Sequence, residues 1–170
     1  MMRSLRSTLT IIAMIALLAG AAFWGWGAAT EPLPEVQDQP LCEDTPVEPG
    51  QKVYPDQVTV SVFNASSRSG LAGRTAELLL DEGFPEGDSG NAPRGTTVIH
   101  SQIWTSDPES PAVRLVKSYL GAQATVVEGE PLGLGVVVVV GEEFGELAKG
   151  RKSAKAVQVG FICSPQGTAD

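Results

Sequence analysis

The sequence predicts an α/β domain built as a two-layer sandwich, in which a mixed sheet carries two helices on one face. Residues 58–63 alternate in side-chain character, as strands do. Residues 71–82 and 111–120 repeat apolar side chains at helical spacing. Five consecutive valines at 136–140 predict a strand covered on both faces. The resulting order, β-α-(β)-β-α-β-β, has the tendency of split βαβ, or ferredoxin-like, folds.

The N-terminal part contains one long apolar segment, residues 9–29, which has no charged side chain. As a helix these 21 residues would be about 31 Å long, close to the roughly 30 Å hydrocarbon core of a bilayer. Arg3 and Arg6 precede the segment, and the first carboxylates follow it. By the positive-inside tendency, we expect residues 1–8 in the cytoplasm and everything after the span outside the membrane.

Two interpretations of this apolar segment are open. Trp24 and Trp26 lie at its outer end, where aromatic rings prefer the membrane interface, and this favours an uncleaved single-pass anchor. The small residues at 27–29 also match the cleavage site of a secretory signal, in which case the mature protein would be secreted. Both interpretations place the rest of the chain outside the cytoplasm.

Residues 30–56 form a linker that is rich in proline and carboxylates. Proline at this density blocks both helices and central strands. We therefore expect a stiff, extended spacer between the membrane and the domain. The six prolines are Pro32, Pro34, Pro40, Pro46, Pro49 and Pro55.

The folded domain is predicted at residues 57–145. Its first strand breaks at Asn64 into a polar loop, and the helix that follows stops at Gly83, where glycine suits the left-handed cap. Phe84 is expected to fold back onto the end of this helix. The apolar face of the helix is assigned to Leu71, Ala72, Ala76, Leu78, Leu79 and Leu80.

The middle of the domain is less regular. Residues 85–95 are turn formers that permit at most a short strand, whereas the β-branched and aromatic residues at 96–104 predict a full one. The second helix begins after Ser110 and ends at Gly121. Residues 124–127 predict a short strand before the valine strand.

The tail, residues 146–170, contains a basic cluster between Lys149 and Lys155. Two interpretations of this cluster are open: it contacts anionic wall polymers or lipid head groups, or it is a solvated helix end. Residues 156–163 are apolar enough to add an edge strand, which a disulfide would hold in place.

Acidic residues outnumber basic residues by 20 to 12. Because Arg3 and Arg6 precede the apolar segment, the chain beyond it has 20 acidic and 10 basic residues and a net charge of −10. Nucleic acid binding depends on clustered basic residues that neutralise phosphates. We therefore expect no nucleic acid partner.

Cys42 and Cys163 flank the predicted domain, and they are the two cysteines of the chain. In an exported protein the simplest interpretation is that they form a disulfide. The alternative is two free or intermolecular thiols, and an intermolecular bridge would produce a homodimer. Two cysteines and His100 are fewer than the four ligands of a structural zinc, and no nucleotide-binding glycine motif is present, so we expect neither metal nor cofactor.

Three pieces of sequence, in this order and at helix-length spacing, resemble a known family. They are VTVSVFNASSRSGLAGRTAELLLDEGF, PAVRLVKSYL and GVVVVVGEEF. Together they resemble the C-terminal domain of LytR-CpsA-Psr cell-envelope proteins, with a valine-rich strand ending in Asn, a Gly-Leu-Ala helix start and a Gly-Phe helix end. The resemblance covers residues 56–145 and leaves the cysteine-bearing tail outside it.

The resemblance implies an extracytoplasmic, membrane-anchored module connected with cell-wall maintenance. The catalytic domain of LytR-CpsA-Psr enzymes is separate and larger, and nothing similar to its arginine- and aspartate-rich pyrophosphate site precedes Val58. We therefore expect a standalone, non-enzymatic form that binds a wall polymer, such as peptidoglycan, or an envelope protein. The alternatives are a small extracytoplasmic enzyme acting on wall material and a scaffolding dimer.

The loop after the first strand is the candidate binding site. Helix N-termini favour anions, and two arginines and two glycines lie nearby in the sequence. The competing interpretation is that the glycines serve a tight turn and close helix packing, while the asparagine bonds its own backbone. The candidate residues for an anion or ligand are Asn64, Arg68, Ser69, Gly70, Gly73 and Arg74.

Overall fold

The computed structural model of the protein describes residues 12–24, 42–129 and 132–165. The chain divides into two units, residues 1–39 and 40–170, and each is described by itself.

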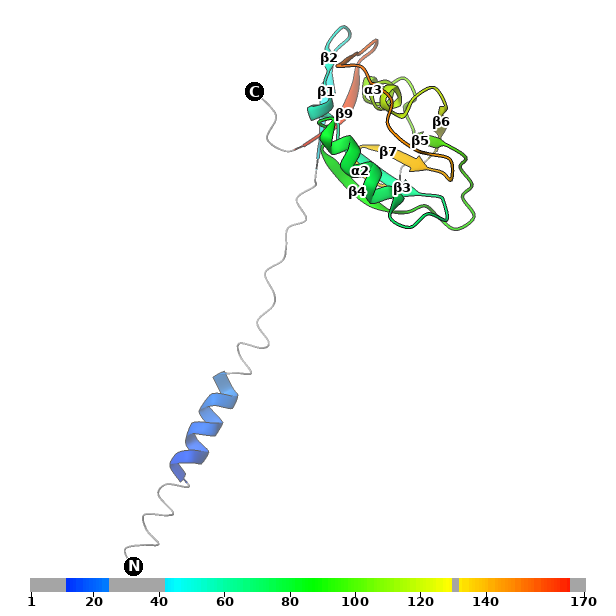
Figure 1. The fold of residues 1–170 in the computed structure, drawn as a ribbon. Helices are drawn as coiled ribbons and strands as arrows, with labels where there is room; N and C mark the ends of the chain where they lie inside the picture. The colour runs from blue at the N-terminus through cyan, green and yellow to red at the C-terminus, as the bar shows by residue number, and fades with distance from the viewer. Residues whose placement is uncertain (1–11, 25–41, 130–131, 166–170) are drawn as a thin grey trace, which may run out of the picture. The chain divides into compact units, whose positions relative to one another are not determined.

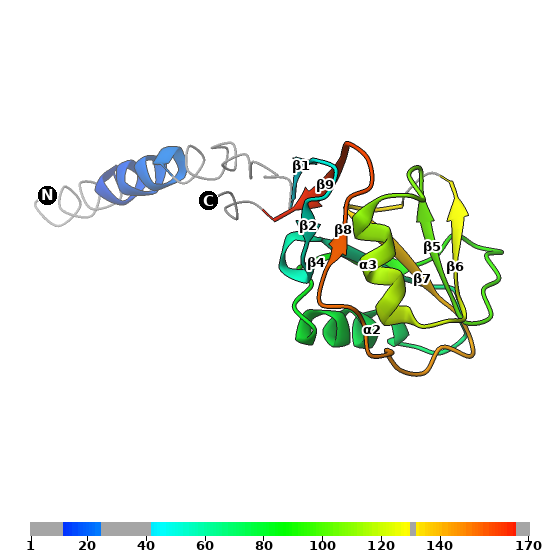
Figure 2. The ribbon, with the colours of Figure 1, turned by 90° about the horizontal axis from the view of Figure 1, so that it is seen from above.

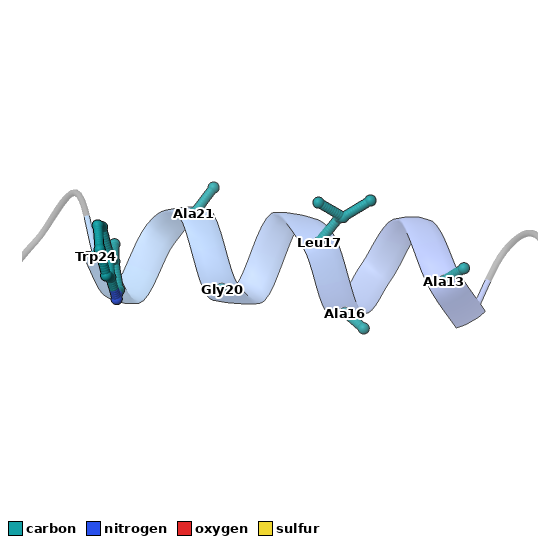
Figure 3. A pocket seen from close by; sticks show the side chains of 6 residues that line it. All are labelled: Ala13, Ala16, Leu17, Gly20, Ala21 and Trp24. Atoms are coloured by element: carbon teal, nitrogen blue, oxygen red, sulfur yellow. The ribbon is translucent and has the colours of Figure 1, made fainter.

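In the first unit, residues 12–24 are helical. Figure 3 shows Ala13, Leu17 and Ala21 along this helix, with the ring of Trp24 at its end. No helix within the described ranges is both long and apolar enough to cross a membrane. The predicted span 9–29 extends beyond the described residues at both ends, and Trp26 lies outside them.

The second unit is organised around a five-stranded mixed sheet with the order β4-β3-β7-β5-β6 (Figure 1). Strand β3 is parallel to both β4 and β7, whereas β5 is antiparallel to β7 and parallel to β6. The mixed sheet predicted from the sequence is confirmed. The strands are β3 (Val60–Asn64), β4 (Glu86–Asn91), β5 (Ser101–Thr105), β6 (Ala124–Glu128) and β7 (Val136–Val140).

Helices α2 (Leu71–Asp81) and α3 (Pro111–Leu120) cover one face of this sheet, which confirms the predicted two-layer sandwich (Figure 1). Alternate residues of the sheet, including Val62, Val138 and Ile103, are fully buried against them. The apolar cluster on the other face is smaller, and there Val137 and Val139 pack under Val98, Phe63 and Trp104. The valine strand is therefore covered on both sides, as its unbroken apolar run predicts.

The end of α2 follows the sequence prediction. Gly83 has a left-handed φ of 94°, and the N–H of Phe84 donates to the carbonyl of Leu79 at 3.0 Å. The buried face of the helix differs from the prediction, because Leu80 is 51% exposed whereas Thr75 is buried. The Thr75 hydroxyl donates to the Leu71 carbonyl at 2.8 Å.

The strand predicted at 96–104 is wrong in its first half, since β5 begins only at Ser101. Residues 98–100 instead pack on the turn after β7, where the N–H of Gly141 donates to the His100 carbonyl at 2.7 Å. Val98 thereby covers the second face of the valine strand. The short strand that residues 85–95 permit does form, as the edge strand β4.

Two small ribbons join the linker to the tail. Strand β1 (Glu43–Val47) pairs antiparallel with β9 (Gly160–Ser164), and β2 (Lys52–Val53) pairs with β8 (Ala154–Lys155). From Glu43 on, the predicted spacer is therefore paired with the tail, and its edge position allows β1 to include Pro46. The earlier part of the predicted spacer, residues 30–41, lies outside the described residues. The predicted tail strand does form, as β9, which contains Cys163 of the disulfide; it pairs with β1 and not with the main sheet.

Cys42 and Cys163 form the predicted disulfide, with their Cα atoms 5.3 Å apart. It closes the β1/β9 ribbon at the point where the chain enters the domain. All the buried apolar side chains of the described residues lie between Cys42 and Ile162. The unit 40–170 thus contains its own core, and we expect it to fold without residues 1–39.

Candidate functional site

The carboxyl ends of three parallel strands meet at one edge of the main sheet. Asn64, the last residue of β3, is in register with Asn91 of β4 on one side and with Val140 of β7 on the other. In open α/β sheets, ligands bind in the crevice outside the carboxyl ends of parallel strands. The helix α2 begins at the same edge, directly after the loop that leaves β3.

A crevice of about 200 Å³ lies at this edge. Its lining combines side-chain amides, one hydroxyl and the exposed backbone of three glycines, and none of the lining residues is charged. Such a surface offers hydrogen-bond donors and acceptors to a neutral polar ligand. The lining residues are Asn64, Gly70, Ala72, Gly73, Ser89, Gly90 and Asn91.

Asn64 holds the loop in its conformation. Its Nδ2 donates to the carbonyl of Arg68 at 2.8 Å, and its Oδ1 accepts from the N–H of Ser66 at 2.8 Å and from Ser66 Oγ at 2.7 Å. Asparagine at the start of a turn commonly bonds its own neighbouring backbone in this way. Because only 8% of Asn64 is exposed, its side chain serves the loop and presents little free surface to the crevice.

Arg68 turns away from the crevice. Its Nη1 donates to the carbonyls of Glu142 and Phe144, which lie in the turn after β7. Ser67 binds the same turn through the Glu142 carboxylate. The backbone N–H of Ser67, then its hydroxyl, and finally the positive charge of Arg68 lower the pKa of Glu142. The anion that this part of the loop binds is thus a carboxylate of the chain itself.

The six sequence-predicted site residues therefore divide into two groups. Asn64, Gly70 and Gly73 line the crevice, whereas Arg68, Ser69 and Arg74 do not. Gly70 has a left-handed φ of 75°, which accounts for glycine at that position. Gly73 is different, because a Cβ there would meet no atom within 4 Å.

Four lining residues, Ala72, Ser89, Gly90 and Asn91, are absent from the residues predicted from the sequence. The last three come from β4, whose polar sequence has no strand signal. Their position follows from topology, because a strand that follows β3 and α2 by a crossover places its carboxyl end beside that of β3.

His100 lies away from the crevice. Its Nε2 is 3.5 Å from the carboxylate of Glu143, and neither residue lines the crevice. A separate cavity of about 320 Å³ lies between the β1/β9 ribbon and the start of α3, and it includes Asp44 and Asp107. Among the described residues, no group of three or more His, Cys, Asp or Glu side chains is placed to hold a metal ion.

A comparison with family models agrees with the resemblance found in the sequence. A family model described as LytR cell envelope-related transcriptional attenuator matches residues 57–144. The crystal structure of the soluble domain of a conserved hypothetical secreted protein from Mycobacterium marinum is 26% identical, with a TM-score of 0.49, and the alignment covers 65% of this chain and 78% of that chain. No curated protein matches the chain. Because the family match covers more than half of the 170 residues, the chain belongs to the LytR C-terminal domain family.

Proposed function

We propose that this protein is a non-enzymatic accessory module of the cell envelope that binds a neutral portion of a wall polymer in the crevice at the ends of β3 and β4. Family membership supplies the envelope association. The observation that carries the rest is the crevice itself, which lies at the carboxyl ends of parallel strands and is lined by Ser89, Asn91 and open glycine backbone.

The chemistry of the crevice suits sugar hydroxyls and peptide amides. Both ligand groups donate and accept hydrogen bonds, as do the amide of Asn91 and the hydroxyl of Ser89. Its volume of about 200 Å³ is smaller than that of a pocket for a drug-sized ligand, roughly 300 Å³ or more. We therefore expect it to hold one sugar unit or one short side branch of a polymer such as peptidoglycan.

The lining residues are better suited to binding a ligand than to catalysing a reaction. Hydrolysis requires a nucleophile or an activated water together with a group that transfers a proton. The crevice offers amides, a hydroxyl and backbone groups, and the pair of His100 and Glu143 lies elsewhere.

An extracytoplasmic location is part of the proposal. The disulfide between Cys42 and Cys163 supports an oxidising compartment. The uncharged segment 9–29, preceded by arginines, supports a single-pass anchor with residues 1–8 in the cytoplasm.

The test is co-sedimentation of residues 40–170 with purified peptidoglycan sacculi. Gly73→Gln should abolish retention, because the new side chain extends into the open space over the crevice without touching the core. Glu77→Gln, at another exposed position of α2, is the matched control and should be retained like the wild type.

Retention no greater than that of an unrelated acidic domain would reject wall binding. In that case, crosslinking in membranes that recovers one dominant protein would identify an envelope protein as the partner. Equal retention of the wild type and Gly73→Gln would show that the wall polymer binds outside the crevice.

A further inference from the structure

Seven of the ten basic residues that follow the apolar segment gather on one part of the domain, although this part of the chain has a net charge of −10. Within the described residues, the sole ion pair closer than 4.0 Å joins His100 and Glu143, so none of the seven has a described carboxylate partner. We call this surface the basic face. It consists of Lys52, Arg114, Lys117, Lys149, Arg151, Lys152 and Lys155.

Hydrogen bonds and strand pairing bring several residues of the basic face together along α3. Arg114 donates through Nη2 to the carbonyl of Lys155, and Lys155 is in register with Lys52 across the β2/β8 ribbon. Further along the helix, the N–H of Arg151 donates to the hydroxyl of Ser118 at 3.0 Å. Figure 2 shows β8 beside α3, with the chain passing from β7 around the domain to reach it.

The basic face is hollowed at one place. A cavity of about 520 Å³ is lined by Arg114, Lys117 and Arg151, together with small residues from both segments. The Nε of Arg114 is buried and has no hydrogen-bond partner among the described atoms. Lys117 and Arg151 are exposed, and together with the Arg114 guanidinium they give this cavity the positive charge that suits an anionic head group.

Apolar side chains follow the basic face in the sequence, and one of them, Phe161, lines the cavity that also includes Asp44 and Asp107. Val157, Val159 and Phe161 are 58%, 61% and 63% exposed, and they directly follow the last basic residue. Between residues 147 and 165 the chain has four basic residues and no acidic residue. The same short segment therefore presents positive charge and then unburied apolar area.

We propose that the domain docks through this segment onto the surface of an anionic phospholipid bilayer. Lipid phosphates would contact the basic face, and the side chains of Val157, Val159 and Phe161 would enter the interface. A soluble polyanion would satisfy the charges, but it would leave the three apolar side chains in water. These apolar side chains therefore favour a lipid surface. This inference does not rest on the crevice at β3 and β4, which involves neither the basic face nor residues 157–161.

The test uses residues 40–170, which lack the N-terminal apolar segment and contain the complete core. We expect co-sedimentation with vesicles that contain phosphatidylglycerol or cardiolipin, weaker binding at high salt, and no binding to phosphatidylcholine alone. Replacing Lys149, Arg151, Lys152 and Lys155 together by Gln should weaken binding at least about tenfold. Arg94→Gln, an exposed arginine outside the basic face, is the control for single replacements such as Lys152→Gln.

The apolar contribution has its own readout. Val159→Ser/Phe161→Ser should weaken vesicle binding, whereas Leu80→Ser/Ile99→Ser, at comparably exposed positions, should not. In Phe161→Trp, the added fluorescence should shift to the blue on anionic vesicles and be quenched by brominated lipid.

Three results would overturn the proposal. One is absence of binding to anionic vesicles. A second is binding that Val159→Ser/Phe161→Ser leaves unchanged and that a soluble polyphosphate abolishes by competition, because this would identify a polyanion site. The third is a dimer in solution that the same double replacement converts to a monomer, because the apolar segment would then be an interface between two copies.

Discussion

The carboxylate of Glu142 accepts two hydrogen bonds from Ser67, one from the backbone N–H and one from Oγ, each 2.8 Å long. The two residues are 75 positions apart and lie after the parallel strands β3 and β7. This contact ties the loop that shapes the crevice to the turn after the valine strand. The sequence predicts that this loop binds an anion. At Ser67 that anion is the Glu142 carboxylate, so the Ser67 donors are not free for another one.

The Ser67–Glu142 contact predicts how the loop responds to acid. Because Ser67 stabilises the ionised carboxylate, the pKa of Glu142 lies below its ordinary value of 4.5. The contact is therefore fully present above about pH 4.5 and is lost as the pH falls through the lowered value. An NMR titration of the Glu142 carboxyl group should give the lowered pKa directly.

Ser67→Ala should move the pKa of Glu142 part of the way back, because the backbone N–H still donates. In Glu142→Gln, the amide signal of Ser67 should lose its acid transition. A pKa of Glu142 at or above 4.5 in the wild type would contradict the contact.

Arg68→Gln should destabilise the domain without changing its fold. The guanidinium donates to the carbonyls of Glu142 and Phe144, and its loss leaves two acceptors without their charged donor. We expect a decrease of about 1–2 kcal/mol in the free energy of unfolding, measured with urea. Arg74→Gln, an exposed arginine on α2, should change it by less than about 0.5 kcal/mol. Equal effects of the two replacements would contradict the structural role of Arg68.

Gly141→Ala tests the close contact between the turn after β7 and residues 98–100. A Cβ at Gly141 would overlap the backbone carbonyl of Val98, and backbone cannot move aside as a side chain can. We expect a loss of about 2–3 kcal/mol, or failure to fold. Gly145→Ala, four residues later, has no atom within 4 Å of the new Cβ and should be nearly neutral. Wild-type stability of Gly141→Ala would show that Val98 does not cover the valine strand in solution.

The sequence predicts best those segments of the fold whose side chains follow a regular pattern. Both helices repeat apolar side chains at helical spacing, the valine strand is an unbroken run of β-branched residues, and the left-handed Gly83 marks the end of α2. Strand β4 has the sequence EGDSGN, with no β-branched or aromatic residue, so its own residues give no strand signal. It is a strand because its backbone pairs with β3 and because the N–H of Asp88 donates to Ser61 Oγ at 2.9 Å.

Residues 96–100 are the opposite case, because their composition predicts a strand that does not form. Thr96, Thr97 and Ile99 have high strand propensity, but Ser101 is in register with the last residue of β7 and the first residue of β6, so a strand that began before Ser101 would have no partner there. The segment instead covers the face without helices. The prediction of the candidate site is incomplete for a related reason. Ser89, Gly90 and Asn91 join Asn64 only through a parallel register that local sequence does not encode.

Reducing the disulfide should weaken the domain strongly. Cys42 and Cys163 are separated by 121 positions, and in the chain-entropy model a loop of that length contributes about 4–5 kcal/mol. Urea unfolding of residues 40–170 with and without reductant measures this contribution. Cys42→Ser/Cys163→Ser should start at the lower stability and show no response to reductant. Identical unfolding curves of the wild type in both conditions would contradict an intramolecular bridge.

Asn64→Asp tests whether the asparagine amide orders the loop. The replacement puts a carboxylate oxygen in place of Nδ2, opposite the Arg68 carbonyl, at a position that is 8% exposed. Two acceptors then face each other, so we expect a loss of about 2 kcal/mol at neutral pH. The fold favours the protonated carboxyl group, which can still donate, and its pKa in the folded state is therefore raised.

The penalty of Asn64→Asp should accordingly be absent below the unfolded pKa of about 3.9 and develop as the pH rises through the higher folded value. The measurement is the difference in unfolding free energy between variant and wild type at each pH, which removes the separate acid response of Glu142. Asn64→Ala, which lacks a titratable group, should lose stability equally at every pH. A penalty of Asn64→Asp that does not change with pH would mean that the Nδ2 donor is not what holds the loop against Arg68.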